Sequence, residues 1–411
     1  MDICKKELCT GCGLCEYVCP QQCISKVIGK EGVAYPYIDE NICISCGKCQ
    51  KLCPANNKIE THEIKEVYAG WHTEEEQRRK SASGGIAFAL YQYAIEHGFY
   101  VCGCYMNAEH KAKFSITNVR KEIDKFANSK YVWSDLTGVY RRIKELVSKE
   151  EKILFIGTPC QVAAVKQLAE NIKAEDSIVL VEVLCHGMAP EEYLLQHINK
   201  VEQNNKKKAF YIKFRDEKFG TSKYYFTMSD KQGNIFYKKN VQDNDVYQFG
   251  FHRNVSLREN CYNCRYAKQE RVADIALSDY YGLGTCQPKV SYGSENVSCI
   301  MINTQKGKEF FEDLVMNKYI YADKRPVEEP FNAQGTLKRP IKKNAKREEF
   351  LRKYRECQNF DQAMEEVFHK DLVKNHVRVC LHIHELFEFS RRVLKKIFPE
   401  KIINKVKKYT R

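Results

Sequence analysis

The sequence predicts an α+β protein in three parts: a short cysteine-rich N-terminal domain, a mixed α/β body and a basic helical tail. Three observations support this fold class. One cysteine pattern occurs twice in the first 60 residues, short apolar strands alternate with helices in the middle of the chain, and basic residues accumulate near its C-terminal end. The predicted parts are residues 1–60, 61–175, 176–339 and 340–411, the second and third being two halves of the body.

The N-terminal domain is organised by two copies of the pattern C-x2-C-x2-C-x3-C-P. Three thiolates at this spacing fit three corners of one [4Fe–4S] cluster, and the fourth cysteine reaches across to the other cluster. Zinc ribbons use two C-x2-C pairs instead of a triple followed by C-P, so zinc is disfavoured. The pattern resembles that of bacterial-type two-cluster ferredoxins. The expected ligands are Cys9, Cys12, Cys15 and Cys53 for one cluster, and Cys43, Cys46, Cys49 and Cys19 for the other.

Cysteine usage also bears on the compartment. Twenty cysteines would indicate disulfides in a small secreted protein. The chain opens Met-Asp-Ile-Cys-Lys-Lys without an apolar signal stretch, and it has no run of 18 apolar residues, so we expect neither secretion nor a membrane span. With eight cysteines assigned to clusters, a cytoplasmic location is expected.

The positive charge is concentrated in the tail. Residues 338–411 carry 21 Lys or Arg and 10 Asp or Glu, so the rest of the chain holds only about +3 of the net +14. A nearly neutral body argues against nucleic-acid binding. The tail has apolar residues at helical spacing, which predicts a helical cap with a solvated basic face, or a contact with a membrane surface or an acidic partner. Those apolar residues are Phe350, Leu351, Tyr354 and Cys357, then Leu386, Phe389, Val393 and Ile397.

The first half of the body predicts a strand, a glycine turn and a helix. After a polar linker at 55–66, a strand is expected at 67–72, a helix from Ile86 to Gly98, and a buried strand at 100–104. Serine hydroxyls and glycines directly before a helix form an anion-binding N-terminus, although an ordinary helix cap has the same sequence. No G-x-G-x-x-G pattern occurs, so a cofactor here would not be held in the usual dinucleotide-binding manner.

The middle of the body repeats a strand–loop–helix unit. A strand at 152–157 is followed by Thr-Pro-Cys-Gln and a helix at 162–172, and a strand at 177–184 is followed by Cys-His-Gly and a helix from Pro190. This alternation predicts parallel strands whose functional loops lie at their carboxyl ends. Residues 209–238 change to a period of two, which predicts an antiparallel sheet.

Each of those two loops contains a cysteine, and a C-x2-C pair follows at Cys261 and Cys264. A single C-x2-C is ambiguous between zinc, a cluster, a redox pair and chance. Together the four thiolates of Cys160, Cys185, Cys261 and Cys264 offer the ligands of a third [4Fe–4S] cluster or of zinc, or they are unrelated buried cysteines. The eight remaining cysteines, Cys4 and Cys23 among them, are expected to be packing residues.

Five motifs, in this order, resemble the β-subunit family of coenzyme F-420-reducing hydrogenases and dehydrogenases. The motifs are Lys80-Ser-Ala-Ser-Gly-Gly85, Gly157-Thr-Pro-Cys-Gln161, Cys185-His-Gly187, Cys261-x2-Cys264 and Ala273-Asp-Ile…Asp279-x2-Gly282. The resemblance covers residues 1 to about 300. It implies a flavin-binding body that holds FAD with a third [4Fe–4S] cluster beside it. Family members often carry a glycine and a tryptophan in the last motif, where this chain has Ser-Asp-Tyr-Tyr-Gly.

The resemblance also assigns residues. It places the first two motifs at the flavin, with contacts from Ser81, Ser83, Gly84, Gly85, Thr158 and Pro159. Lys80, His186 and Asp279 are candidates to tune the flavin or to supply a proton, and each also has an ordinary structural interpretation.

These patterns predict an FAD- and iron–sulfur-dependent oxidoreductase. Clusters would exchange single electrons with ferredoxin or another redox protein, and a flavin would pair the electrons and deliver a hydride to a small-molecule acceptor, coenzyme F-420 or another organic compound. The alternative is an electron-input subunit of a larger redox complex, without its own substrate and with the tail as its docking element. A cluster-based sensor lacks support because no DNA-reading module is recognisable.

Overall fold

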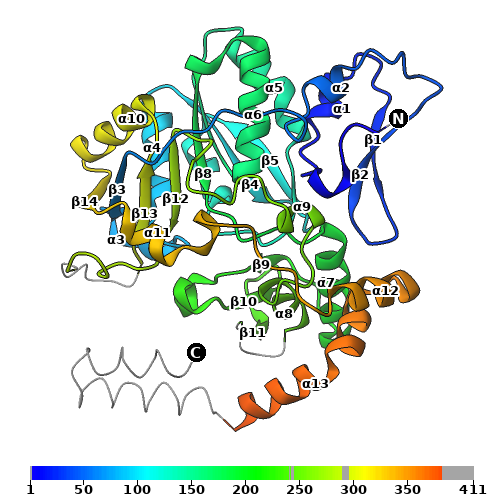
Figure 1. The fold of residues 1–411 in the computed structure, drawn as a ribbon. Coiled ribbons are helices and arrows are strands. Elements are labelled where there is room, and N and C mark those ends of the chain that lie inside the picture. Colours follow the sequence, from blue (N-terminus) through cyan, green and yellow to red (C-terminus); the bar gives the residue numbers. More distant parts are fainter. Residues whose placement is uncertain (1, 240, 242–244, 289–295, 382–411) are drawn as a thin grey trace.

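The computed structural model describes residues 2–239, 241, 245–288 and 296–381. Within them, the body is built on one mixed sheet of nine strands (Figure 1). In sheet order the strands are β14 (Ile320–Arg325), β3 (Glu66–His72), β13 (Ser298–Ile302), β12 (Ile275–Asp279), β8 (Ile178–Val183), β7 (Ile153–Gly157), β4 (Tyr100–Met106), β5 (Ala112–Thr117) and β6 (Ser134–Asp135). A mixed α/β architecture behind an N-terminal cysteine-rich region was predicted and is confirmed.

The centre of this sheet is parallel. Strand β8 pairs in parallel with β7 on one side and with β12 on the other, and β7 pairs in parallel with β4. The carboxyl ends of β7, β8 and β12 therefore lie at the same edge of the sheet. The predicted parallel pairing of the strands at 152–157 and 177–184 is thus confirmed, whereas the entry of β12 beside β8 was not predicted.

Helices cover both faces of the sheet. They are α4 (Ile86–Glu96), α10 (Gln305–Met316), α5 (Tyr140–Val147) and α6 (Pro159–Ile172). Successive residues of a strand point to opposite faces. Leu154 and Val179 accordingly pack with α4 and α10, while Phe155 and Leu180 pack with α5 and α6. This double cover explains why β7 and β8 are apolar at nearly every position.

Helix α6 begins at Pro159, three residues before the predicted start. Thr158 caps it, because the Thr158 side chain accepts from the helix backbone and the Gln161 side chain accepts from the Thr158 N–H at 2.9 Å. Proline in the first helical position suits this cap. As a result, Cys160 belongs to the first turn of a helix and not to a loop.

The N-terminal region lies beside the sheet (Figure 1). It contains α1 (Leu14–Val18), β1 (Ile24–Ile28), β2 (Ala34–Ile38) and α2 (Lys48–Lys51), and β1 and β2 form an antiparallel hairpin. Glycines at equivalent places in the two cysteine patterns, Gly13 and Gly47, adopt φ values of +76° and +70°. Only glycine takes this left-handed conformation freely, so each lets the chain turn from the cysteine loop into a helix.

Direct contacts fix the N-terminal region to the body. The Tyr140 hydroxyl donates to the Cys12 carbonyl at 2.9 Å, Lys26 Nζ lies 2.6 Å from Asp135 Oδ1, and the Tyr193 hydroxyl donates to a carbonyl of the β1–β2 turn at 2.7 Å. These contacts are spread over the region, so its cysteine loops have a defined position relative to the sheet.

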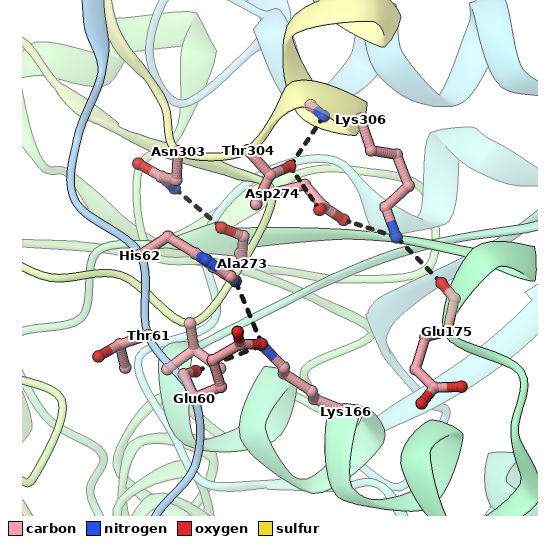
Figure 2. A network of polar contacts seen from close by, with 12 residues as sticks. Glu60, Thr61, His62, Lys166, Glu175, Ala273, Asp274, Asn303, Thr304 and Lys306 are labelled. Carbon is pink, nitrogen blue, oxygen red and sulfur yellow. Dashed lines mark hydrogen bonds and ion pairs between the residues drawn. The ribbon is translucent and has the colours of Figure 1, made fainter.

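The linker that was predicted at 55–66 is ordered by polar contacts with the body (Figure 2). Lys166 of α6 donates to the Glu60 carboxylate at 2.9 Å, and His62 forms a backbone bridge with Arg271. Nearby, Thr304 and Lys306 bind the carboxylate of Asp274 at 2.7 and 3.3 Å. These contacts therefore fix the linker against the body.

A second layer lies below the main sheet in Figure 1. It comprises β9 (Tyr211–Lys213), β10 (Phe226–Ser229) and β11 (Ile235–Lys239), which form the predicted antiparallel sheet, with α7 (Glu191–Asn205), α8 (Val246–His252), α12 (Arg347–Cys357) and α13 (Phe360–Cys380). The remaining short helices are α3 (Glu75–Lys80), α9 (Glu259–Tyr262) and α11 (Glu328–Ala333). Phe350, Leu351 and Tyr354 are buried in this layer, on the face that the sequence indicated.

Part of the predicted tail, including the apolar positions from Leu386 to Ile397, lies outside the described residues. Among the helices within the described ranges, none is both long enough and apolar enough to cross a membrane.

Candidate functional site

The first candidate site consists of the inner cysteines, which are Cys9, Cys12, Cys15 and Cys53. These four were predicted as one ligand set. Burial raises the pKa of the Cys12 thiol to about 11, and Cys53 and Cys9 add to the rise because their negative charges lie nearby. Burial and the same neighbours also raise the pKa of Cys15. The fold therefore gathers the first three cysteines of one pattern with the fourth cysteine of the other.

The outer cysteines are Cys19, Cys43, Cys46 and Cys49. Burial raises the pKa of Cys49, and the charges of Cys19 and Cys43 contribute to that rise. Cys46 is exposed at the surface. The outer set consequently has one edge open to solvent, whereas the inner set lies against the body.

Two cysteines that were expected to be packing residues lie beside these sets. Cys4 is hydrogen bonded to Cys9 and Cys53, and the Cys23 Sγ lies 3.4 Å from the Cys19 Sγ. Each extra thiol thus contacts the fourth ligand expected for one cluster. Sequence reasoning had no signal for this arrangement because neither cysteine belongs to the repeated pattern.

The body cysteines are Cys160, Cys185, Cys261 and Cys264, and all four line one small cavity. They come from separate elements: Cys160 from α6, Cys185 from the end of β8, and the other two from α9 and the turn after it. Burial raises the pKa of Cys160 to about 12 and that of Cys261 to about 11. Without a cation the thiols hold their protons, and iron would hold them as thiolates.

The small cavity also touches the N-terminal region. Cys12 of the inner set lines it together with the body cysteines, and so do Trp133 and Arg258. A set of four thiols suits an iron–sulfur cluster because sulfur ligands favour iron clusters and zinc. Within the described parts of the chain, no group of three or more His, Cys, Asp or Glu is arranged so that it could hold a single metal ion.

A large cavity of about 1500 Å³ opens at the carboxyl edge of the sheet. Its walls include the turn at 81–85, the ends of β7, β8 and β12, and residues of the second layer. Six of the predicted flavin-site and catalytic residues line it: Ser81, Ser83, Gly85, Thr158, His186 and Asp279. Residues from four of the five motifs therefore meet at this one cavity.

Three predicted residues lie elsewhere. Gly84 is packed inside the fold, where its N–H donates to Ser298 Oγ at 2.9 Å and where an added Cβ would come within 2.5 Å of the Gly70 carbonyl. Pro159 lines the small cavity only. Lys80 lines neither cavity, and its exposed ammonium is paired with Glu76 one helical turn away.

The two cavities share a wall. Thr158, Cys185 and His186 line both of them. His186 Nε2 lies 2.7 Å from Asn254 Oδ1, and desolvation lowers the pKa of the imidazole, which favours its neutral form. A neutral imidazole at this wall has one N–H donor and one acceptor nitrogen.

Asp279 ends strand β12 as part of a polar cluster. Its carboxylate accepts from Arg215 Nη1 at 2.9 Å and from the Tyr224 hydroxyl at 3.1 Å. Arg215 and Tyr224 also line the large cavity. The sequence identified Asp279 but missed its two partners, because they lie about 60 residues away along the chain, in the second layer.

Lys130 is a further cavity residue that sequence analysis missed. Its ammonium donates to the carbonyls of Phe126, Ala127 and Asn128 at 2.8–3.1 Å. Burial lowers the pKa of Lys130 to about 8. A lysine that loses its proton so near neutral pH can exchange a proton within the cavity.

Family comparisons agree with this arrangement. Residues 150–327 match the family described as the C terminus of the coenzyme F-420 hydrogenase/dehydrogenase beta subunit. Residues 150–327 of this chain thus match the F-420 hydrogenase/dehydrogenase beta-subunit family. Residues 8–57 and 35–102 match two families of 4Fe-4S dicluster domains, which makes the N-terminal region an iron–sulfur electron-transfer module. The resemblance predicted from the sequence is therefore confirmed.

One similar solved structure is the xenon-derivatised F-420-reducing [NiFe] hydrogenase complex from Methanosarcina barkeri. One of its chains is 19% identical to this protein, with a TM-score of 0.46. The alignment covers 77% of this chain and 92% of that chain. No curated protein matches the sequence.

Proposed function

We propose that this protein is a cytoplasmic iron–sulfur flavoprotein that passes electrons between a redox protein and a small organic hydride acceptor. One observation carries the proposal. Cys12 of the inner set lines the same small cavity as the four body cysteines, and that cavity shares a wall with the large one. The inner cysteines, the body cysteines and the large cavity thus adjoin one another from the N-terminal region to the carboxyl edge of the sheet.

In this proposal the inner, outer and body cysteines hold three [4Fe–4S] clusters, and each cluster supplies one-electron transfer. The outer set is the contact point for the partner, since Cys46 is exposed and two neighbouring apolar side chains, Ile42 and Ile44, are 49% and 60% exposed. Apolar residues around an accessible ligand suit a transient protein–protein contact. A ferredoxin or a similar small redox protein fits this surface.

The large cavity is proposed to hold FAD, which pairs electrons and transfers them as a hydride. Ile86, Ala87 and Phe88 of the first turn of α4 line the cavity, and the N–H groups at a helix start have no partner within the helix. These backbone N–H groups would bind the flavin pyrophosphate. Ligand pockets usually measure about 300–1,000 Å³, so a cavity of about 1500 Å³ has space for the cofactor and a second reactant.

In this proposal, different residues of the chain would bind charge and transfer protons. Arg215, held in place by Asp279, offers a cation for negative charge on the bound molecules. Lys130 and His186 are the groups positioned to hold or move a proton. Lys80 has no part in the proposal because it lies outside both cavities.

Anaerobic reconstitution of the full chain tests this proposal. Three [4Fe–4S] clusters require about twelve iron atoms per chain, and the protein should retain a flavin that dithionite bleaches. A preparation with about eight iron atoms would rule out the cluster at the body cysteines. A preparation that is fully loaded with iron and never retains a flavin would rule out the flavoprotein.

The second candidate is an electron-input subunit of a larger complex, and the family description of a beta subunit favours it. The two functions differ in what the isolated chain does. An enzyme should reduce an added acceptor catalytically with reduced viologen as donor. An input subunit should accept electrons into its clusters and flavin and show no turnover with any small acceptor until a partner protein is added.

A further inference from the structure

Arg258 occupies the boundary between the N-terminal region and the body. It is 1% exposed. Its guanidinium reaches across the boundary to the Ala34 carbonyl, 3.3 Å from both Nη1 and Nη2, and to the Cys9 carbonyl, 3.4 Å from Nη2. The rings of Tyr35 and Trp133 lie within 5.4 and 5.7 Å of its central carbon.

No carboxylate pairs with this cation in the part of the chain that the structure describes. Other buried arginines do have one: Arg215 is paired with Asp279, Arg271 with Glu182 and Arg325 with Glu329. In addition, the Nε of Arg258 has no hydrogen-bond partner among the described residues. A buried charge without a counter-charge is strongly unfavourable, so the site calls for an anion that the protein side chains do not supply.

The cysteine pattern approaches this guanidinium very closely. A Cβ added to Gly11 would lie 2.9 Å from Arg258 Nη2 and 2.9 Å from Trp133 Nε1, and Gly11 has a φ of +70°. Glycine is therefore required here both by space and by backbone conformation. Arg258 also lines the small cavity with Cys12, Cys261 and Cys264. Arg258 thus contacts the inner set through the Cys9 carbonyl and adjoins the body cysteines at the cavity wall.

We propose that Arg258 is a positioning residue whose charge is shared by the inner cluster and the body cluster, and that it raises the reduction potentials of both. This inference rests on the proposed function, since it requires the cluster at the body cysteines. A [4Fe–4S] cluster held by four thiolates is an anion, and reduction makes it more negative. A fixed cation in a water-poor interior stabilises the reduced form, and its effect decreases with distance. The effect on the reduction potential of the outer cluster should therefore be small.

The test uses the reconstituted full chain with Arg258→Gln, Arg258→Lys and the control Arg352→Gln. Glutamine keeps a donor for the carbonyls but removes the charge, lysine keeps the charge, and Arg352 is an exposed arginine of α12 paired with Glu356. Potentials are measured by anaerobic titration followed by electron paramagnetic resonance, with iron analysis alongside. A Cys46→Ser variant identifies the signal of the outer cluster.

In Arg258→Gln we expect full iron content, two potentials shifted downward and an unchanged outer potential. Arg258→Lys and Arg352→Gln should stay close to the unmodified protein. The inference is overturned if the glutamine variant keeps all three potentials, if only one falls, or if the lysine variant falls equally. Arg258→Gln could abolish cluster assembly. In that case an Arg258→Lys variant that binds its full iron and keeps its potentials supports the role of the charge. An Arg258→Lys variant whose potentials shift overturns the inference. An iron content of about eight atoms in the unmodified chain would rule out the third cluster of the proposed function. This failure is measured before any variant is compared, so it is distinct from a failure of the Arg258 inference.

Discussion

Lys130 illustrates how a single side chain gains a property that its sequence neighbourhood does not reveal. The segment around it looks like an ordinary polar loop, yet backbone carbonyls and the cavity wall surround its ammonium. Desolvation favours the neutral amine, so the pKa of this lysine lies well below its ordinary value. Among the cavity residues, this makes Lys130 the best candidate for a proton donor near neutral pH.

In the proposed function, we expect the rate of viologen-driven bleaching of the flavin to depend on the protonation of Lys130. With a pKa of about 8, the ammonium form is lost as the pH rises through 8, so the rate should fall over that range. In Lys130→Arg the guanidinium keeps its proton over the whole range, so the rate should be low throughout and the fall near pH 8 should disappear. The exposed Lys125→Arg change, in the preceding 3-10 helix, should leave the profile unaltered. A profile that is identical in all three proteins would exclude Lys130 from proton transfer.

His197 is a second residue whose state depends on the assembled fold. It is buried between Asp245, at 3.0 Å, and Asp361, at 2.8 Å. Burial disfavours its charge, but the two carboxylates outweigh that effect and raise the pKa of His197 to about 10, while the pKa of Asp245 is lowered by the same pairing despite its burial. The imidazolium links α7, α8 and α13.

The stability of the protein should therefore depend on pH in a definite direction. Because the pKa of His197 is raised from 6.5 to about 10, its contribution is complete below pH 6.5 and is lost as the pH rises through 10. Unfolding followed by circular dichroism should show a loss of stability over that interval that is smaller in His197→Gln.

Removing one partner of a buried charge pair costs about 3–5 kcal/mol, so the His197→Gln variant should also be clearly less stable at pH 6. The matched control is Lys200→Gln, which removes an exposed ion pair with Glu365 between the same two helices, α7 and α13. An exposed pair contributes about 0–1 kcal/mol. Equal losses in the two variants would contradict the role given to His197.

At the scale of elements, the loop between β2 and α2 is the most distinctive surface feature of the N-terminal region. It presents Ile42, Ile44 and the exposed Cys46. The β1–β2 hairpin also exposes apolar side chains, Val27, Ile28 and Tyr37, but within the described N-terminal region only this loop combines exposed apolar residues with an exposed cysteine. In the proposed function, this loop is therefore where an outside electron carrier comes nearest to a cluster ligand.

Changing Ile44 to Asp should slow reduction by a ferredoxin about tenfold or more, because a charge would have to be buried in an apolar contact. Reduction by dithionite, which needs no docking surface, should be unchanged. Met316, which is 72% exposed at the end of α10, provides the control, and Met316→Asp should affect neither rate. Stopped-flow spectroscopy at the cluster absorbance distinguishes these cases. Equal slowing with both reductants would indicate damage to the cluster and not to docking.

The comparison between sequence and structure also belongs to this scale. Local patterns predicted β7, β8 and the helices after them, because apolar runs and caps are encoded within a few residues. The position of β12 next to β8 was beyond that reasoning, since strand neighbours are chosen by packing over about 90 residues. For the same reason Asp279 could be named as a candidate, whereas Arg215 and Tyr224 could not.

For the whole molecule, residues 350–368 of the tail contribute to the core of the second layer. Phe350, Tyr354 and Phe360 are completely or almost completely buried and pack around Tyr193 of α7. Sequence analysis placed a boundary at 339/340 from the rise in basic charge. The basic charge of α12 and α13 reflects their exposed residues, whereas their apolar faces complete the core of the second layer.

A chain that ends after residue 339 should accordingly fail to fold. Deleting several buried aromatic side chains costs about 3–5 kcal/mol for each, which exceeds the usual stability of a domain. A chain that ends after Leu381 keeps these residues and should retain the iron content and thermal unfolding temperature of the full chain. Soluble, iron-loaded protein from the shorter version would show that α12 and α13 are dispensable.

The anchoring of the N-terminal region has one more consequence. The N-terminal region is held at separate points by Tyr140, Lys26 and Tyr193, and Lys166 donates to Glu60 of the connecting segment. Many carriers with a tethered electron shuttle must wait for the shuttle to swing between donor and acceptor. In the proposed function no swing is needed, so raising the solvent viscosity with sucrose should slow the arrival of the outside carrier but leave the internal electron-transfer rate unchanged.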